Sequence, residues 1–357
     1  MKRKEFIAVA MSGGIDSAVA AGILAQQGNR IIGVYLDLWK GSGEKEENNN
    51  QKEIAIENIK TIAEMFNFPF KVIQAKTKFK ESIVKYFINA ISQGITPNPC
   101  VLCNKIMKFD FLFKKVQKLG VTKIATGHYV RKAILKSGRF SLRKGADKNK
   151  DQSYYLCLLS QEQLRIAMFP LSNKQKPEVL NQAKQFGLNI KEIKESQDLC
   201  FLEGKDYREF IKKYAPYILK RGDIVNEEGK IIGSHEGLGL YTIGQRKGIG
   251  VYSTRPIYVI KKDVLKNRLI VSKNIHLGRN NFEVKDINWI TRKKGKKPFY
   301  ADVKIRYRAK PVRATIKPIT ENSVFVRLDK QLRDITPGQF AVFYHKDIVL
   351  GGGIIKI

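Results

Sequence analysis

The first half of the chain alternates short apolar runs with longer amphipathic segments, and this order restricts the fold more than any other feature. The apolar runs are typical of buried strands and lie at Phe6–Ala10, Ile31–Leu38, Phe70–Gln74 and Lys123–Thr126. The segments between them favour helix and lie at Ala18–Gln27, Glu53–Phe66, Ser82–Ile91 and Phe109–Leu119. Strands that alternate with helices predict an α/β fold, in which crossover helices cover a parallel sheet.

The second half of the chain has a different character. We predict a hairpin from Tyr129–Leu135 and Arg139–Arg143, helices between residues 161 and 186, and a short helix at Tyr207–Tyr214. Short strands then follow one another, at Ala301–Arg308, Val312–Pro318, Ser323–Leu328, Gln339–Tyr344 and Ile348–Ile355. Strands of this length and spacing predict a small C-terminal β-barrel, preceded by a small central α+β domain. We therefore predict domains at residues 1–204, 205–272 and 273–357, and a polar loop at residues 41–52.

The charge of the chain indicates a polyanionic partner. Lys and Arg number 66 against 33 Asp and Glu, which gives the 357 residues a net charge of +33. Such a surplus opposes compaction by self-repulsion, and its usual use is to neutralise nucleic-acid phosphates. In Ala301–Arg308 strand alternation places Lys304, Arg306 and Arg308 on one face. A codon bias towards Lys is the alternative explanation, but we favour an RNA partner.

The sequence also indicates the cellular compartment. We find no apolar run long enough to span a membrane, and the basic N-terminus runs into a strand without the cleavage pattern of a signal peptide. The chain has four cysteines, too few for the disulfide framework of a secreted protein. We expect a cytoplasmic protein, a monomer, whose cysteines are free thiols, metal ligands or catalysts.

The segment Ser12–Ser17 is the clearest candidate for a ligand-binding loop. It reads Ser-Gly-Gly-Ile-Asp-Ser between a predicted strand and an Ala-rich helix. The glycines allow a sharp turn and close approach of a ligand, while the hydroxyls and the helix N-terminus present donors to phosphate. The loop lacks the Gly-Lys-Ser/Thr of a Walker motif. A tight turn with a Ser cap is the alternative, and the full pattern favours phosphate binding.

Two cysteines, Cys103 and Cys200, are candidates for catalysis. Cys103 follows the turn Thr96–Pro99 at or near a helix N-terminus, close to Lys105 and Lys108. Both features stabilise a thiolate, so we expect a lowered pKa for the Cys103 thiol. Cys200 lies in a predicted loop before a helix. Cys157, in an apolar run, is expected to be a small buried hydrophobe.

These motifs resemble a known family. SGGIDS at the first strand–helix turn is similar to the loop of the N-type ATP pyrophosphatases, which are adenine nucleotide alpha hydrolase-like α/β proteins. The complete series resembles the bacterial tRNA-specific 2-thiouridylases over essentially the whole chain. The motifs, in order, are SGGIDS (12–17), TPNPCVLCNK (96–105), ATGHYV (125–130), KDQSYYL (150–156), the Cys200 loop, YTIGQRKGIG (241–250), IRYR (305–308), TPGQFAVFY (336–344) and LGGGII (350–355).

The resemblance implies an activity and its residues. ATP, with Mg²⁺, would adenylate the 2-oxygen of the wobble uridine in a tRNA. Sulfur from a persulfide on Cys200, delivered directly or as hydrosulfide after Cys103 attacks, would then displace AMP, so that the products are 2-thiouridine, AMP and pyrophosphate. A sulfur-donor protein, either a cysteine desulfurase or a sulfur-relay protein, would load Cys200, and the two cysteines would end as a disulfide.

The remaining implied site residues fall into three groups. The ATP site would comprise Ala10, Met11, Ser12, Gly13, Gly14, Ile15, Asp16 and Ser17, with Leu36 and Gly127 near the adenosine. The target base would contact Asn98, Pro99 and Cys100. The tRNA would contact His128, Lys150, Asp151, Gln152, Arg306, Tyr307 and Gln339.

The sequence departs from the commonest family pattern at Ala10, Leu36 and Cys100. Gly, Met and Asp are usual there, and only the last change alters the chemistry, because Cys100 creates a C-x-x-C with Cys103. Structural zinc would need a second pair at similar spacing. An iron–sulfur cluster held by Cys100, Cys103 and Cys200 is the rival to the persulfide route.

Two other classes of function remain as alternatives. A small-molecule ligase of the ATP pyrophosphatase type would have no use for Cys103, Cys200 or the charge of +33. It would release pyrophosphate without tRNA. A non-enzymatic RNA-binding protein would not need an intact ATP loop, and absence of ATP binding would favour it.

Overall fold

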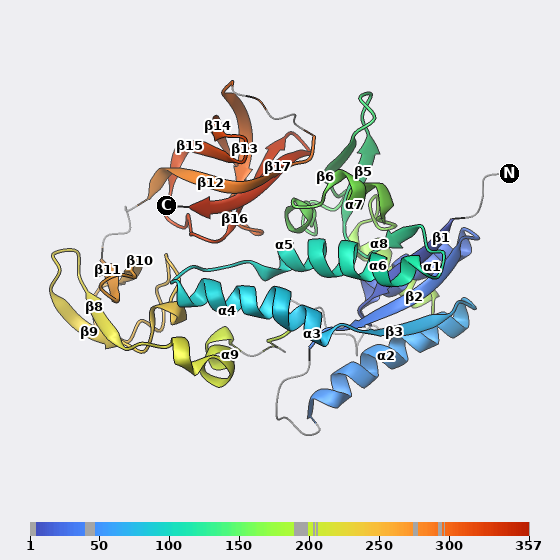
Figure 1. Cartoon of the computed structure of the whole chain (residues 1–357), viewed down its shortest axis with the longest axis horizontal. Helices are drawn as coiled ribbons and strands as arrows, with labels where there is room; N and C mark the ends of the chain where they lie inside the picture. The colour runs from blue at the N-terminus through green and yellow to red at the C-terminus, as the bar shows by residue number, and fades with distance from the viewer. Residues whose placement is uncertain are drawn as a thin grey trace.

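The computed structural model of the chain describes residues 5–39, 47–188, 199–202, 204, 206–273, 278–291, 295 and 297–356. Within these ranges the chain forms a parallel sheet with its helices, a smaller mixed sheet and a β-barrel (Figure 1). The three units adjoin one another, and buried side chains from the first unit share clusters with each of the other two. The described residues include no helix long and apolar enough to cross a membrane.

The parallel sheet confirms the α/β prediction. Its strands, in spatial order, are β3 (Phe70–Gln74), β2 (Arg30–Asp37), β1 (Phe6–Met11), β4 (Lys123–Ala125) and β7 (Ala167–Met168). Strand β7 lies inside the region predicted to be helical, between α7 (Gln161–Ile166) and α8 (Lys176–Gln185). That prediction was wrong there because a strand of two residues carries no periodicity of its own. Ala167 is strand only through its pairing with Ile124.

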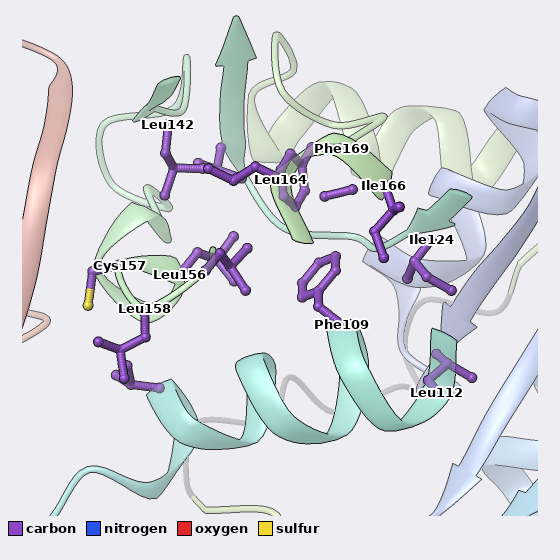
Figure 2. Packing of buried hydrophobic residues seen from close by; sticks show 14 of the residues in the cluster. Phe109, Leu112, Ile124, Leu142, Leu156, Cys157, Leu158, Leu164, Ile166 and Phe169 are labelled. Carbon is purple, nitrogen blue, oxygen red and sulfur yellow. The ribbon is translucent and has the colours of Figure 1, made fainter. Parts of the chain in front are cut away.

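Alternate residues of β1 pack against helices on opposite faces of the sheet. Ile7 and Val9 share a cluster with α1 (Ile15–Gln26), α2 (Glu47–Met65) and α8. Ala8 faces the helical run of α5 (Pro99–Cys103), the π-helical η2 (Asn104–Leu112) and α6 (Phe113–Gln117). Figure 2 shows Phe109 of this run facing Phe169, with ring centroids 6.1 Å apart. Burial on both faces explains why β1 reads as a continuous apolar run.

The predicted loop at residues 41–52 is wrong in its second part. Residues 40–46 lie outside the described residues, but helix α2 already begins at Glu47. Ile59 and Ile62 of this helix are buried against the sheet. Lys52 forms an ion pair with Asp37 at 2.8 Å. These tertiary contacts extend the helix through a segment whose local composition favours a loop.

A second helical run connects the parallel sheet to the smaller sheet. It comprises α3 (Lys76–Phe79), η1 (Lys80–Val84) and α4 (Lys85–Ser92), and α4 lies beside α5 in Figure 1. The smaller sheet has the order β10 (Tyr258–Asp263), β11 (Arg268–Ser272), β8 (Gly222–Val225) and β9 (Ile231–His235). Short helices α9 (Tyr207–Tyr214), η4 (Pro216–Ile218) and η5 (Leu238–Leu240) precede or join these strands. Gly239 packs so closely that a β-carbon there would lie 2.5 Å from Ile91 of α4.

The barrel confirms the predicted C-terminal architecture. Its order is β12 (Arg279–Trp289), β15 (Ser323–Leu332), β14 (Val312–Thr320), β13 (Phe299–Lys304), β16 (Phe340–His345) and β17 (Ile348–Lys356), and β12 pairs with β17 to close it. The strand predicted at Ala301–Arg308 ends at Lys304, so the sequence overestimated its length. Arg306 and Tyr307 lie in a turn, where the Ala309 amide donates to the Arg306 carbonyl at 3.1 Å.

The first unit and the barrel share a hydrogen-bonded edge. The predicted hairpin is confirmed as β5 (Val130–Ile134) and β6 (Phe140–Lys144), and β6 pairs with the start of β17. Short helix η3 (Ser153–Leu156) packs against this junction, where Ser153 Oγ lies 3.1 Å from Tyr344 Oη of β16. Cys157 is fully buried there, and a β-carbon on Gly352 would lie 2.9 Å from its sulfur. The prediction that Cys157 is a structural, buried residue is confirmed.

Candidate nucleotide and cysteine site

The loop Ser12–Ser17 connects the carboxyl end of β1 to the N-terminus of α1. Its hydroxyls organise the turn: the Ser12 amide donates to Ser17 Oγ at 3.2 Å, and Ser17 Oγ donates to the Gly14 carbonyl at 2.8 Å. Gly13 has φ +78°, and a β-carbon there would lie 2.5 Å from Ala55 Cβ. Glycine is therefore required at this position both by backbone conformation and by space. The loop leads directly into the N-terminus of α1, and helix N-termini are suited to binding phosphate.

The loop is completed by two residues that sequence reasoning did not identify. Tyr129 Oη donates to Asp16 Oδ1 at 2.8 Å, and Lys176 Nζ forms an ion pair with the same oxygen at 2.8 Å. The Lys176 side chain is only 11% exposed, so its charge is held beside the loop rather than in solvent. Tyr129 lies within the ATGHYV motif, but Lys176 had no signal beyond the Pro177 that starts α8.

The other predicted ATP residues converge on the same edge of the sheet. A β-carbon on Gly127, just after β4, would lie 2.7 Å from the Asp16 carbonyl carbon, so this backbone packs directly on the start of α1. Ala10 and Met11 end β1, and Leu36 is near the end of the adjacent β2. Ligands of open α/β sheets bind at the carboxyl ends of the strands, which is where these residues lie.

Cys100 and Cys103 lie in the first turns of a helical run that begins at Pro99, as predicted. Asn98 is the residue before this helix. Cys103 is buried and packs in a cluster with Phe87, Met107 and Phe201. The prediction of a lowered pKa is wrong. Burial and then the neighbouring Cys200 raise the pKa of the Cys103 thiol, while Lys108 opposes them.

Cys100 has a similar electrostatic environment. Cys100 is half-buried. Burial raises the pKa of its thiol to about 12, and Cys200 adds to this rise while Lys108 opposes it. The local sequence predicted a thiolate at Cys103 because Lys105 and Lys108 are close in the chain. The packing around the thiols has the larger effect.

Cys200 comes near these two cysteines from a segment about a hundred residues further along the chain. The next residue, Phe201, anchors it: the Phe201 ring lies 5.2 Å from that of Phe87 and 5.1 Å from that of Phe210. Cys200 is exposed at the surface, yet the protein packed around its thiol raises the pKa, and Lys108 opposes the rise. All four cysteines of the chain are free thiols in this structure. Cys200 is thus reachable from solvent beside a buried partner.

The cysteines lie near the carboxyl end of β2, the strand beside the one that leads into the loop Ser12–Ser17. Tyr35, which pairs with Met11 in the sheet, has a pKa raised by burial, by Asp37 and by Cys200. Asp37 at the end of β2 is buried and pairs with Lys52 and with Lys76. Among the described residues no three His, Cys, Asp or Glu side chains converge as a metal-binding group.

The predicted tRNA contacts divide into buried and accessible residues. His128 is buried, its Nδ1 lies 2.7 Å from Thr126 Oγ1, and burial followed by Lys108 holds its pKa well below the usual range, so the ring is neutral. Asp151 is buried and accepts hydrogen bonds from Ser153. Gln152 Oε1 accepts the Tyr129 amide at 3.1 Å. Gln152 therefore supports the loop that carries Tyr129.

The barrel residues Arg306, Tyr307 and Gln339 lie around the turn before Cys100. The Tyr307 ring lies 4.5 Å from that of Tyr155. Gln339 Nε2 donates to the Thr96 carbonyl at 3.0 Å. Arg306 donates to Thr336 Oγ1. The structure thus brings together residues that are some 240 positions apart in the chain.

The fold and site define a nucleotide-binding α/β protein with paired cysteines and two β-rich units. Comparison with known families agrees. Residues 5–204 match the family described as tRNA methyl transferase HUP domain, residues 208–273 the tRNA methyl transferase PRC-barrel domain, and residues 279–355 the aminomethyltransferase beta-barrel domain.

Full-length relatives specify the family. The chain is 41% identical over 353 residues to tRNA-specific 2-thiouridylase MnmA 2 of Clostridium botulinum (strain Langeland), with 99% of each chain covered. It is 38% identical to tRNA-specific 2-thiouridylase MnmA of Clostridium acetobutylicum, covering 98% of this chain and 99% of that protein. The protein of the same name from Heliobacterium modesticaldum is 41% identical, covering 99% and 92%. The chain belongs to the tRNA-specific 2-thiouridylase family.

Proposed function

We propose that this chain replaces the 2-oxygen of the wobble uridine of a tRNA with sulfur, in a reaction that consumes ATP. The observation that carries the proposal is that Cys103 and Cys200 lie close to each other near the carboxyl end of β2, which neighbours the strand leading into the loop Ser12–Ser17. A phosphate-binding loop alone fits any enzyme that adenylates its substrate. Two thiols at the same edge of the sheet fit the subsequent transfer of sulfur. The family membership and the charge of +33 support tRNA as the substrate.

The first step is adenylation. The uracil 2-oxygen is a poor leaving group, and its attack on the α-phosphate of ATP expels pyrophosphate and converts the oxygen into part of AMP. The amides at the start of α1 and the ammonium group of Lys176 lie where they can offset the charge that develops on the phosphates. Asp16 and Ser17 supply oxygen donors of the kind that Mg²⁺ prefers, and Mg²⁺ bound with ATP would neutralise phosphate charge.

The second step is sulfur transfer. Cys200 is exposed, so a donor protein can load it with a terminal persulfide sulfur. That sulfur attacks carbon 2 of the activated base and AMP departs with its electron pair. Cys103 then attacks the Cys200 sulfur, which forms the Cys103–Cys200 disulfide and releases 2-thiouridine. A thiol reductant must restore both cysteines before another cycle. The raised pKa of Cys103 keeps its thiol protonated until a base removes the proton.

The tRNA would lie over the surface between the first unit and the barrel. The target base leaves the anticodon stack and meets Asn98, Pro99 and Cys100. We propose that Lys150, Gln152, Arg306 and Tyr307 surround this base, and that Gln339 and the buried His128 and Asp151 support this surface from within. Residues 1–204 would perform catalysis, while residues 205–272 and 273–357 would bind the tRNA.

Nucleoside analysis tests the function directly. Transfer RNA from cells that lack the protein should contain no 2-thiouridine at the wobble position, and the purified protein with ATP, a sulfur donor and this tRNA should restore it. Pyrophosphate release that does not depend on tRNA would instead identify a small-molecule ligase.

Cysteine variants distinguish the persulfide route from the iron–sulfur alternative. We expect Cys103→Ser and Cys200→Ser to abolish thiolation and Cys100→Asp to retain it. The assay is in-vitro thiolation by anaerobically purified protein, together with iron and sulfide determination. Stoichiometric iron that is lost together with activity in Cys100→Asp would replace the persulfide route with a cluster.

A further inference from the structure

The turn that leads to Cys100 receives its support from the barrel. The Ile95 amide still bonds within its own unit, to the Ala90 carbonyl at 2.9 Å. The next amide, that of Thr96, donates to the Pro337 carbonyl at 3.1 Å. From Thr96 onwards the turn therefore depends on residues that lie far away in the chain.

The barrel turn Thr336–Gln339 contacts the segment Ile95–Pro97 through hydrogen bonds and close packing. Gln339 Nε2 donates to the Thr96 carbonyl at 3.0 Å and to the Pro97 carbonyl at 3.4 Å. Gly338 has φ +88°, and a β-carbon on it would lie 2.1 Å from Ile95 Cγ2 and 3.1 Å from the Thr96 oxygen. The close approach requires glycine, and the two carbonyls require a donor.

The barrel turn is itself held in place. The Gly338 amide donates to the Ile355 carbonyl of β17 at 3.0 Å. Thr336 is buried, and Arg306 donates to its hydroxyl while also lying 3.9 Å from Asp334. These contacts connect the turn to the barrel wall rather than leaving it as a free loop.

A second contact reaches the same cysteine. The Tyr307 ring lies 4.5 Å from the Tyr155 ring at an interplanar angle of 34°. Burial, then Cys100 and Tyr307, raise the pKa of Tyr155, so Tyr155 lies near both of these residues. The Tyr155 carbonyl in turn accepts a hydrogen bond from the buried Asn104, one residue after Cys103. The barrel thus supports the cysteine-bearing helix indirectly, through the turn before it and through Tyr155 beside it.

We propose that Gln339 is a positioning residue: it holds the Thr96–Pro97 backbone so that Pro99 starts the helix with Cys100 and Cys103 in register with the target base. The proposal rests on the proposed function for the role of that base. The Gln339 side-chain amide donates its hydrogen bonds to carbonyls of the protein itself. Removing it should therefore lower the rate of sulfur transfer and leave the affinity for tRNA unchanged. A shift of about 1 Å at a reacting group can reduce a rate about a hundredfold.

The experiment compares Gln339→Ala and Gln339→Glu with the matched control Gln331→Glu, which changes an exposed glutamine of the same barrel. Glutamate at position 339 has the same size as glutamine, but its carboxylate cannot donate a hydrogen bond to the Thr96 and Pro97 carbonyls. We expect kcat for thiolation to fall about tenfold or more in both Gln339 variants, with the Kd for tRNA within about twofold of the wild type. The control should match the wild type in both quantities.

A tRNA-independent readout separates this proposal from the proposed function. Alkylation of Cys103 by iodoacetamide, followed by peptide mass spectrometry without tRNA, should be several-fold faster in the Gln339 variants because their turn is loosened. Gly338→Ala should accelerate it too by displacing Ile95. Unchanged Cys103 labelling, or a tRNA Kd weakened tenfold with kcat preserved, would overturn the positioning role. Absence of thiolation in the wild type, with altered labelling in the variants, would refute only the proposed function.

Discussion

Replacing Gly127 with alanine places a methyl group against the backbone at the start of α1. The added carbon would lie 2.7 Å from the Asp16 carbonyl carbon, 2.8 Å from its oxygen and 2.9 Å from the Ser17 nitrogen. Ordinary contact begins near 3.4 Å, so the nearest approach is short by about 0.7 Å. The obstructing atoms are backbone, which cannot rotate away as a side chain can. The helix N-terminus and its phosphate donors must therefore move.

The magnitude follows from this displacement. Overpacking of a close-packed site costs about 1–3 kcal/mol of folding stability. A phosphate loop shifted by about 0.7 Å loses hydrogen-bond geometry to ATP, and we expect the Kd for ATP to rise about tenfold or more, which corresponds to about 1.4 kcal/mol. Titration with labelled ATP measures the affinity, and thermal unfolding measures the stability.

Gly138→Ala is the matched control. Gly138 lies at the tip of the β5–β6 hairpin with φ +77°, and no atom lies within 4 Å of the position that an alanine β-carbon would take. Alanine there costs backbone strain of about 1 kcal/mol without touching the loop. We expect this variant to lose stability and to bind ATP like the wild type. If Gly127→Ala binds ATP with unchanged Kd, the contact between β4 and α1 does not position the phosphate site.

Three further predictions follow from the site. Lys176→Met should raise the Kd for ATP about tenfold, whereas Lys174→Met, a charge change nearby, should leave it unaltered in the same titration. Because burial raises the pKa of Cys103, its thiolate fraction rises with pH, and alkylation should increase about tenfold per pH unit without a plateau up to about pH 9; a plateau below that pH would contradict the raised pKa. The Kd for tRNA should increase steeply with salt, by about 0.9 in log Kd against log salt for each phosphate contact, and a flat salt dependence in filter binding would exclude the basic surface as the tRNA site.

The sequence alone was sufficient to predict those features that depend on residues close together in the chain. The turn Ser12–Ser17 was predictable because its glycines and hydroxyls determine the backbone path locally, and Gly13 indeed requires φ +78°. Strand and helix order was predictable because burial on both faces of β1 leaves a short continuous apolar run, whereas the longer Ala-rich run of α1 favours helix. The order of motifs also identified the family, since each motif is contiguous in the chain.

Other features depended on residues far apart in the chain. Strand β7 and the first turns of α2 exist through pairing and packing that their own residues do not encode. The pKa of Cys103 was misjudged because local lysines suggested a thiolate, while burial among Phe87 and Phe201 has the larger effect. Lys176 reaches Asp16 across 160 positions, which no spacing in the sequence reveals.

Features that could be predicted from the sequence differ from those that could not in the distance along the chain over which they are determined. A turn, a helix start or a run of alternating residues is determined by torsional preferences and by burial within a few positions, so the sequence by itself determined the phosphate loop, the α/β order and the barrel. Electrostatic environment and catalytic register are sums over whatever groups the fold brings into contact. Only the tertiary structure therefore decided that Cys103 is a buried thiol, that Lys176 pairs with Asp16 of the loop Ser12–Ser17, and that the barrel turn at Gln339 contacts the turn at Thr96.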